Sequence, residues 1–432
     1  MRSISLQDIA AYAQAVDQPV ATVAQRAVTT NGIYLAAHNN AVGAVNPRVF
    51  SLELTTGGVT NQKHSGRCWL FAALNTVRHR LETTLNVENI ELSQSYPYFF
   101  DKLEKANVFL ELVIDTADQP LDDRRVDLAM RTPQPEGGWW SYAAALIEKY
   151  GVVPKSAMAE AKTTEESKEL NIVLDRRLRK GALQLRAAAE VDRADLKQAI
   201  LRDIYRILVI AIGTPPTRFD WAYRDKDKTY HRLADLTPRQ FAETYALPLD
   251  QVTVANDPAQ PYGRVLVRED GENMVGTAPV TVVNQPMETL KDLVIKQLEA
   301  GEAVWLGCDV RIDVDPEGVM DTGVRDLGGL FGVDLAMSKA ENLATFDSVM
   351  SHAMTITGVD VVDGLPRQWK VENSWGDDRG LKGWWTMSDA WFDRYGYTVV
   401  IRRDLLDEDT LAALGTEPIR LPRWAPLSQV AA

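Results

Sequence analysis

Cysteine is nearly absent from this chain, with only Cys68 and Cys308 among 432 residues. Two cysteines cannot build a framework of disulfides, which indicates a reducing compartment. An excess of positive charge is also missing, because the net charge of -13 at pH 7 offers no basic surface to nucleic acid. The longest apolar run, Ile207 to Ile212, is too short to cross a bilayer, and the N-terminus lacks the apolar core of a signal peptide. These absences predict a cytoplasmic protein without membrane or nucleic-acid partners.

The stretch from Asn61 to Asn75 places one of the two cysteines at the start of a helical pattern. After Cys68, apolar residues recur at helical spacing, at Leu70, Leu74, Val77 and Leu81. A cysteine in the first turn of a helix lies at the positive end of the macrodipole, which favours the thiolate. Gln62, six residues upstream, can place a side-chain amide where an oxyanion would need a donor. Cys68 is therefore a candidate nucleophile.

The alternative for any cysteine is a small, buried, apolar residue without chemistry. We apply that interpretation to Cys308, because it lies in an apolar segment, from Ala303 to Val310, with no histidine nearby in sequence. For Cys68 the alternative is weakened by the glutamine upstream and by Trp69 directly after it.

A histidine and an asparagine lie on two predicted strands near the end of the chain. A β-branched strand begins at His352, a turn follows at Asp363 and Gly364, and a second strand returns as far as Asn373. In a cysteine peptidase the thiolate attacks, an imidazole moves the proton, and a third polar group orients the imidazole. The sequence therefore predicts that Cys68, His352 and Asn373 share one site.

Only four other histidines compete for the role of base. His79 lies on the same predicted helix as Cys68 but roughly 16 Å further along its axis, out of reach of the sulfur. His38 and His231 lie in polar segments that predict no strand to hold them. His64 is close to Cys68 in sequence and is the one serious rival, but no orienting partner is evident for it.

Together these motifs resemble the bleomycin hydrolase/aminopeptidase C family of papain-like cysteine peptidases. Gln62, Cys68-Trp69, His352 and Asn373-Ser-Trp-Gly match papain-like peptidases in general. The branch itself is indicated by the longer blocks Asn61-Gln-Lys-His-Ser-Gly-Arg-Cys-Trp, Lys149-Tyr-Gly-Val-Val-Pro-Lys, Ser351-His-Ala-Met and Val371-Glu-Asn-Ser-Trp-Gly. Cys68 and His352 are about 280 residues apart, against roughly 130–150 in papain-like enzymes of ordinary size. The family is similar in carrying large insertions.

The resemblance implies an α+β fold, a papain-like two-lobed cysteine peptidase with a large helical insertion. On this basis the chain divides into an N-terminal lead-in (1–60), a helical lobe with the nucleophile (61–160), a mostly helical insertion (161–302), a β-rich lobe with the histidine and asparagine (303–415) and a C-terminal arm (416–432). Two long helices are predicted between Thr163 and Ile212 inside the insertion.

The implied activity is that of a cysteine aminopeptidase of broad specificity, which removes N-terminal residues from peptides through a thioester. Cys68 would attack, His352 would act as base and then acid, Asn373 would orient His352, and Gln62 would bind the oxyanion. No metal or organic cofactor is needed. The partners are peptide substrates and further copies of the chain in a homohexamer. Two alternatives are a cysteine hydrolase of non-peptide amides and a catalytically idle binding protein of the same fold. The preferred N-terminal residue is not set by the sequence.

The last twelve residues, from Leu421, contain two prolines and end in small residues. Chain ends are usually poorly ordered, but Trp424 and Leu427 are apolar residues that would be left in water. Family members resemble each other in folding such an arm into their own cleft, where the terminal carboxylate meets the substrate's amine. On this resemblance, Ala431 or Ala432 would supply that gate.

Overall fold

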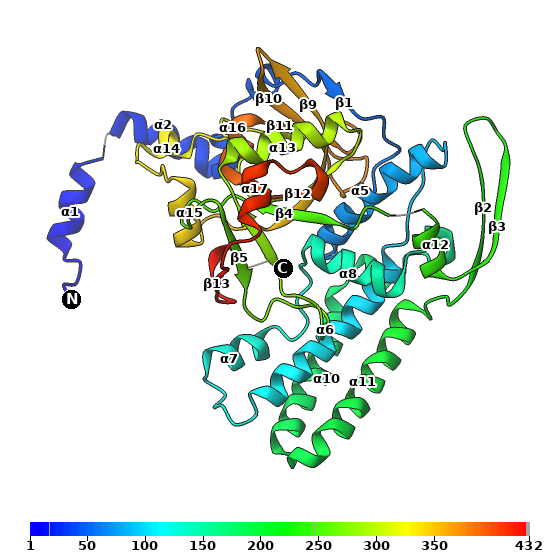
Figure 1. Cartoon of the computed structure of the whole chain (residues 1–432). Helices are drawn as coiled ribbons and strands as arrows, with labels where there is room; N and C mark the ends of the chain where they lie inside the picture. Colours follow the sequence, from blue (N-terminus) through cyan, green and yellow to red (C-terminus); the bar gives the residue numbers. More distant parts are fainter. Residues whose placement is uncertain (17, 246, 429–432) are drawn as a thin grey trace.

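A computed structural model describes residues 1–16, 18–245 and 247–428. The chain begins with four helices that extend along one side of the body (Figure 1). They are α1 (Leu6–Gln14), α2 (Gln18–Asn31), α3 (Ile33–Ala36) and α4 (Val42–Val45). Ser5 caps α1 by accepting from the Asp8 backbone, and the Asp8 carboxylate accepts from the Ser5 backbone in return. No residue of α1 is buried, so its apolar side chains have no cover within the chain's described part.

A second group of helices packs around the first helix of the predicted lobe. It comprises α5 (Cys68–Thr84), α6 (Ser95–Asp115), α7 (Arg124–Arg131), α8 (Trp140–Tyr150) and α9 (Lys162–Glu165), with a 3-10 turn at Lys155–Ala157. α5 is buried along nearly its whole length. α8 ends at Gly151, whose φ of 81 allows the chain to leave the helix in a conformation that other residues rarely adopt.

The two long helices predicted between Thr163 and Ile212 are confirmed as α10 (Lys168–Ala187) and α11 (Glu190–Ile212). They project from the body beside the end of α6 (Figure 1). Their facing stripes are apolar and buried, with Leu170, Leu174 and Leu178 on one helix and Ile200, Ile204 and Leu208 on the other. The chain then returns to the body through a hairpin of β2 (Phe219–Arg224) and β3 (Tyr230–Leu236), followed by the short helix α12 (Pro238–Thr244).

The other half of the body is an 11-stranded sheet, which runs in the order β13-β5-β6-β4-β12-β7-β9-β10-β11-β8 with β1 paired to β9. Its strands are β1 (Leu52–Glu53), β4 (Gln251–Ala255), β5 (Arg264–Arg268), β6 (Thr281–Asn284), β7 (Val304–Cys308), β8 (Val319–Met320), β9 (His352–Val362), β10 (Leu365–Glu372), β11 (Trp384–Ser388), β12 (Gly396–Arg402) and β13 (Ile419–Leu421). The helices that accompany it are α13 (Met287–Glu299), α14 (Leu327–Phe331), α15 (Lys339–Thr345), α16 (Asp389–Tyr395) and α17 (Glu408–Ala413), with 3-10 turns at Arg403–Leu405 and Pro426–Ser428.

The sheet draws strands from both sides of the expected division at residue 302. β4, β5 and β6 come from the segment assigned to the mostly helical insertion, and they join the sheet through β12. Their short β-branched runs have no alternation because each strand is buried in its middle. Such runs cannot be assigned to a lobe from sequence alone.

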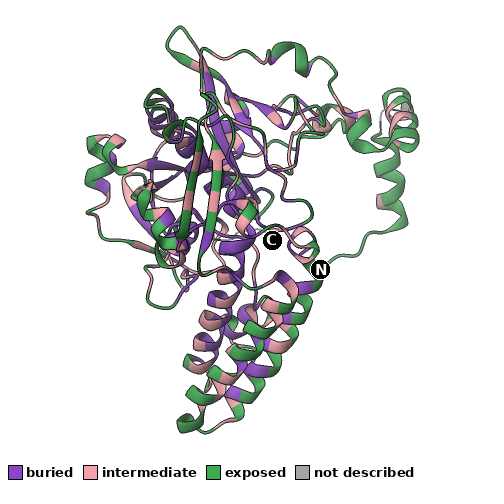
Figure 2. Ribbon diagram, turned by 90° about the vertical axis from the view of Figure 1, so that its right-hand side faces the viewer, coloured by how far each residue is buried: buried purple, intermediate pink, exposed green. Residues whose placement is uncertain are grey.

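The helical group and the sheet meet along α5. The Trp305 indole donates to the carbonyl of Trp69 at 3.1 Å, and the Thr355 hydroxyl donates to the carbonyl of Ala72 at 3.3 Å. Figure 2 shows that buried residues are concentrated in the central strands and on the inward faces of the helices. The start of α5 and the start of β9 are therefore fixed relative to each other by a shared core. No helix in the described ranges is both long and apolar enough to cross a membrane.

Candidate active site

Cys68 is the first residue of α5, as the sequence predicts, and it is half-buried. The loop before it is attached through Gln62 to Ser374, which follows β10 of the sheet. The Gln62 backbone N–H donates to the carbonyl of Ser374 at 2.8 Å, and the Gln62 side-chain oxygen accepts from the Ser374 hydroxyl at 2.6 Å. The amide nitrogen of the same side chain donates to the carbonyl of Ser65 at 2.6 Å. A second amide hydrogen stays available, as an oxyanion donor requires.

The same loop is attached on its other side to the helical group by Arg67 and Glu136. Arg67 is fully buried, and its guanidinium lies 2.8 Å from Glu160 and over the ring of Tyr98. The Glu136 carboxylate accepts from the backbone N–H of Gly66 at 3.2 Å. A Cβ on Gly66 would lie 2.5 Å from the Glu136 side chain, so a glycine is required there. These contacts hold the turn that leads into Cys68.

His352 is the first residue of β9, and Asn373 directly follows β10. The two strands are antiparallel neighbours joined by a turn at Asp363 and Gly364, which both have positive φ. His352 Nε2 lies 2.9 Å from Asn373 Oδ1, and both side chains are buried. The Trp375 ring covers the imidazole at a centroid distance of 5.0 Å. The ring orientation is thus fixed, and Nδ1 is the nitrogen left for a reacting partner.

The Cys68 thiol lies beside the start of β9, the strand that begins at His352. Hydrogen bonding from the Ala353 backbone, next to His352, acts on the Cys68 thiol. Burial is the larger effect, and it raises the pKa of Cys68 to about 11. Burial also lowers the pKa of His352 to about 4, although the hydrogen bond that the imidazole donates to Asn373 opposes this shift. The free site therefore favours a neutral thiol and a neutral imidazole, whereas the helix position alone predicts a thiolate. The sequence shows the helix start but not the burial.

The four other histidines have partners elsewhere. His79 is buried between Glu82 and Glu372, at 3.3 and 2.8 Å. His38 and His231 pair with other carboxylates, and His231 lies in β3 rather than in an irregular segment. His64 is exposed, and its backbone pairs with the chain at Glu165 and Glu166.

Cys308 is completely buried, which confirms the prediction of a core cysteine. It lies on β7 directly opposite His352 of β9, and burial raises the pKa of its thiol well above the ordinary value. Across residues 1–16, 18–245 and 247–428, no group of three or more histidine, cysteine or acidic side chains could hold a metal ion.

Two positions around the site were not found by sequence reasoning. Glu136 holds Gly66, and its negative charge contributes to the raised pKa of Cys68. In the sequence, Glu136 stands out only as the acidic residue directly before the pair Gly137-Gly138. Gly138 packs against the Trp69 ring, next to Cys68. Ser374, inside the quoted Asn-Ser-Trp-Gly motif, orients Gln62. Its role depends on a contact between segments more than three hundred residues apart.

The C-terminal segment is packed as far as it is described. Leu427 and Ser428 are buried, and the turn Pro426–Ser428 lies against α15. The guanidinium of Arg124 lies 4.1 Å from the centre of the Trp424 ring. The expected gating residues Ala431 and Ala432 lie outside the described residues.

A family model for the peptidase C1-like family matches residues 3–428. Aminopeptidase C of Lactobacillus delbrueckii subsp. lactis is 43% identical over 426 residues, which cover 96% of this chain and 95% of that protein. Aminopeptidase G of the same organism is 43% identical over 98% of this chain and 99% of its own. The crystal structure of PepW from Lactobacillus rhamnosis HN001 superposes with a TM-score of 0.97 at 44% identity, with 99% of each chain covered. The expected fold, a two-lobed papain-like enzyme of mixed helix and sheet, is confirmed by that match.

Proposed function

The chain belongs to the peptidase C1-like family and is a cysteine aminopeptidase, and on that premise we propose that Cys68, His352 and Asn373 carry its chemistry. The observation that supports this most directly is the 2.9 Å contact between His352 and Asn373, next to Cys68 at the start of α5. The alternatives, a hydrolase of non-peptide amides and an idle binding protein, are not favoured by relatives named as aminopeptidases.

In the proposed reaction, the proton of Cys68 moves to His352 Nδ1 as the sulfur attacks the scissile carbonyl. His352 then gives that proton to the leaving amine, and a thioester remains on Cys68. Water attacks the thioester with His352 again as base, which releases the first residue and restores the thiol. Asn373 accepts from Nε2–H throughout, so it holds the ring without adding a charge.

The developing oxyanion needs preorganised donors in this scheme. We propose that they are the Gln62 side chain, which Ser374 and Ser65 hold, and the backbone N–H of Cys68 at the start of α5. The Cys68 amide is one of the N–H groups that has no acceptor inside its helix.

The pH dependence of kcat/KM should show an acid limb well below the ordinary histidine value. Burial lowers the pKa of His352 to about 4, so the imidazolium forms only when the pH falls through that region. The active form, which carries one proton on the Cys68–His352 pair, is retained above it and lost below it. The substrate's α-amine, with a pKa of about 8, stays protonated across this limb and does not shape it.

The measurement is initial rates of release of an aminoacyl fluorophore between pH 3.5 and 8, with recovery of full activity after return to neutral pH as the control for unfolding. An acid limb at or above about 6.5, the unperturbed histidine value, would contradict a buried neutral pair.

We also propose that the end of the chain restricts the enzyme to N-terminal residues. The described part of the arm ends in buried Leu427 and Ser428. A terminal carboxylate at Ala432, or a chain end at Ala431, would pair with the substrate's ammonium in a partly desolvated cleft.

Removal of residues 429–432 should lower the rate on a free peptide and allow cleavage of its N-acetylated copy. This cut keeps Leu427, whose loss would expose apolar surface and confuse the result. The comparison is one peptide, free and acetylated, with full-length and shortened protein, followed by mass spectrometry. An unchanged preference for the free amine would show that the arm has only a structural role.

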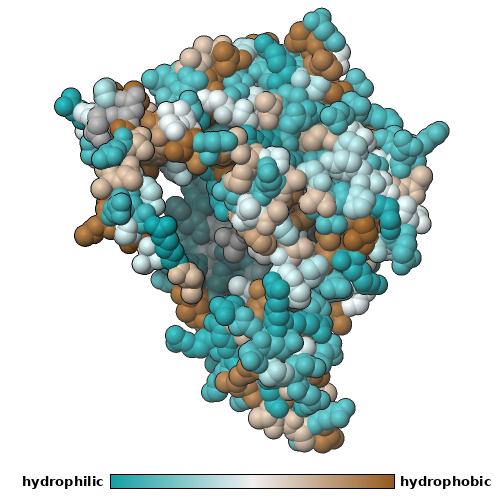
Figure 3. All heavy atoms as spheres, turned by 90° about the vertical axis from the view of Figure 1, so that its left-hand side faces the viewer, coloured by the Kyte–Doolittle hydropathy of each residue, from teal (hydrophilic) through white to brown (hydrophobic). Residues whose placement is uncertain are grey.

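We further propose a cytoplasmic homohexamer, supported by the apolar side chains that the N-terminal helices leave uncovered. The exposed set includes Ile4, Leu6, Ile9, Tyr12, Val20 and Val23. Figure 3 shows that this side of the molecule is hollowed between the N-terminal helices and the body. Exposed apolar surface of this extent is typical of protein contacts.

Native mass spectrometry should therefore detect six chains for the natural protein and smaller species for a Leu6→Asp, Ile9→Asp double variant. Burying two carboxylates in an apolar contact is strongly unfavourable. Leu365→Asp, at a comparably exposed apolar residue that begins β10, is the matched control. Six chains in the double variant would exclude α1 from the contact, and a monomeric natural protein would overturn the hexamer.

A further inference from the structure

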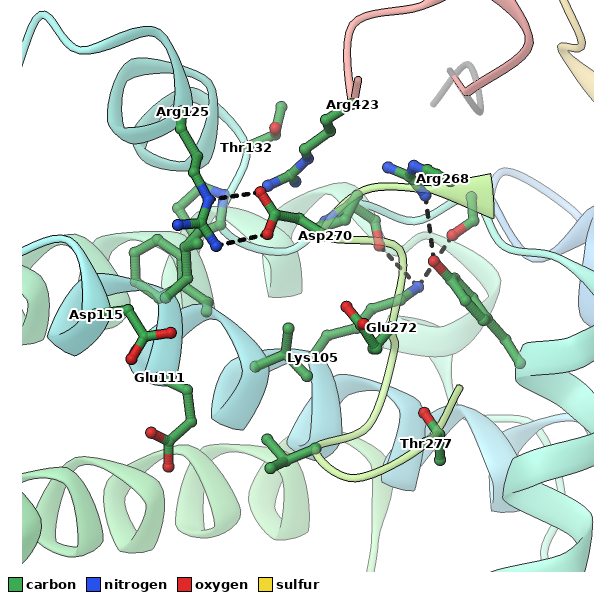
Figure 4. Close-up of a pocket in the computed structure, with 18 of the residues that line it drawn as sticks. Lys105, Glu111, Asp115, Arg125, Thr132, Arg268, Asp270, Glu272, Thr277 and Arg423 are labelled. Atoms are coloured by element: carbon green, nitrogen blue, oxygen red, sulfur yellow. Dashed lines mark hydrogen bonds and ion pairs between the residues drawn. The ribbon is translucent and has the colours of Figure 1, made fainter. Parts of the chain in front are cut away.

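A cavity separate from the Cys68 cleft lies between α6, α7 and the segment that links β5 to β6, with Arg423 of the C-terminal segment at its edge (Figure 4). Its volume is about 280 Å³, near the lower end of the roughly 300–1,000 Å³ of small-molecule sites. None of the four proposed catalytic and oxyanion residues lines it.

Four cationic and four acidic side chains line this cavity, and half of them are already engaged. Arg125 makes two hydrogen bonds of 2.6 Å to Asp270. Lys105 donates to two main-chain carbonyls at 3.0 Å, and Glu111 is bonded to Lys197 outside the cavity. These groups need no ligand.

The other four charged side chains of the lining are unmatched. Among the described residues, Arg268, Arg423, Asp115 and Glu272 form no ion pair with one another or with any other side chain. Arg268 Nη1 donates to the Tyr142 hydroxyl at 3.2 Å, and its buried Nε has no acceptor there. Burial and the nearby charge of Arg268 both lower the pKa of Arg423. Both arginines line the cavity together with Asp270, the carboxylate that already binds Arg125.

The unmatched acidic groups and an apolar wall complete the lining. Asp115 comes from the end of α6 and Glu272 from the segment after β5, and Figure 4 shows Asp115 on the side of the cavity away from Arg268. Phe109 and Leu112 of α6 contribute apolar side chains to the lining. A phosphate dianion would be repelled by these carboxylates, and a simple cation by the two arginines.

We propose that this cavity binds a free α-amino acid with an apolar side chain, whose carboxylate meets Arg268 and Arg423 and whose ammonium meets Glu272. Phe109 and Leu112 would contact the side chain. The ligand would pair the two arginines and Glu272, which an anion or a cation alone cannot do. Asp115 is exposed, so water solvates its carboxylate. The proposal does not rest on the assignment of Cys68, because it concerns binding and not hydrolysis.

Equilibrium dialysis of radiolabelled L-leucine tests the proposal on full-length protein whose Cys68 has been alkylated with iodoacetamide, which removes turnover. We expect saturable binding of one leucine per chain. Leucinamide lacks the carboxylate and 4-methylpentanoate lacks the ammonium, so each should bind at least about ten-fold more weakly.

The variants Arg268→Gln and Arg423→Gln should each weaken leucine binding by at least about ten-fold. Arg206→Gln, at an exposed arginine of α11 that does not line the cavity, is the matched control. Arg423 bonds no described side chain, so its replacement tests the site even if Arg268→Gln lowers the melting temperature. The proposal is overturned by no saturable binding at millimolar leucine, by equal affinity for 4-methylpentanoate, or by unchanged binding in Arg423→Gln.

Discussion

Replacing Cys68 with alanine should abolish release of the N-terminal residue, with kcat falling by at least roughly 10⁴-fold. The sulfur is the atom that forms the thioester, and no other group in the cleft can take its place. Cys68 is half-buried at a helix start, where alanine is well tolerated, so the fold should be retained. The measurement is kcat on an aminoacyl amide, with thermal unfolding as the check on folding.

Chemical labelling gives an independent test of the same residue. Iodoacetamide should modify Cys68 and leave Cys308 unmodified in the folded protein, because Cys308 is completely buried. Cys308→Ala is the matched control and should keep the activity. Labelling at Cys308 together with activity in Cys68→Ala would refute the assignment of the nucleophile.

Replacing His352 with alanine should lower kcat by roughly 10³–10⁴-fold, whereas Asn373→Ala should cost about 10²-fold. His352 moves the proton in both half-reactions, but Asn373 only holds the ring through its 2.9 Å contact with Nε2. The two effects should not add in the double variant, because Asn373 has no imidazole to orient once His352 is replaced.

The control for this series is His64→Ala, since His64 is the rival base nearest to Cys68 in sequence. It is exposed and should be replaceable with little loss of activity. If His64→Ala is inactive and His352→Ala keeps its activity, the base has been assigned to the wrong residue.

The positions that the sequence predicts best are those where one short motif determines a local structure. The apolar spacing after Cys68 predicts a helix that starts at that residue, and α5 does. The β-branched run from His352 and the turn at Asp363 predict a hairpin that places Asn373 beside the imidazole, as β9 and β10 do. In both cases the information lies within about twenty neighbouring residues.

What the sequence could not predict depends on contacts between distant segments. The raised pKa of Cys68 and the lowered pKa of His352 come from burial by both lobes, which no local pattern records. Glu136 acts on Gly66 across seventy positions of the chain. β4 and β6 are short buried strands, and only pairing shows that they belong to the large sheet.

The central claim is that this chain removes N-terminal residues through Cys68, and one time course tests it most directly. A single peptide, free and N-acetylated, is incubated with the natural protein and with protein alkylated at Cys68, and the products are identified by mass spectrometry. The account predicts stepwise loss of residues from the free peptide alone, and no cleavage after alkylation. Cleavage of the acetylated peptide at internal bonds, or stepwise release that survives complete alkylation of Cys68, would contradict it.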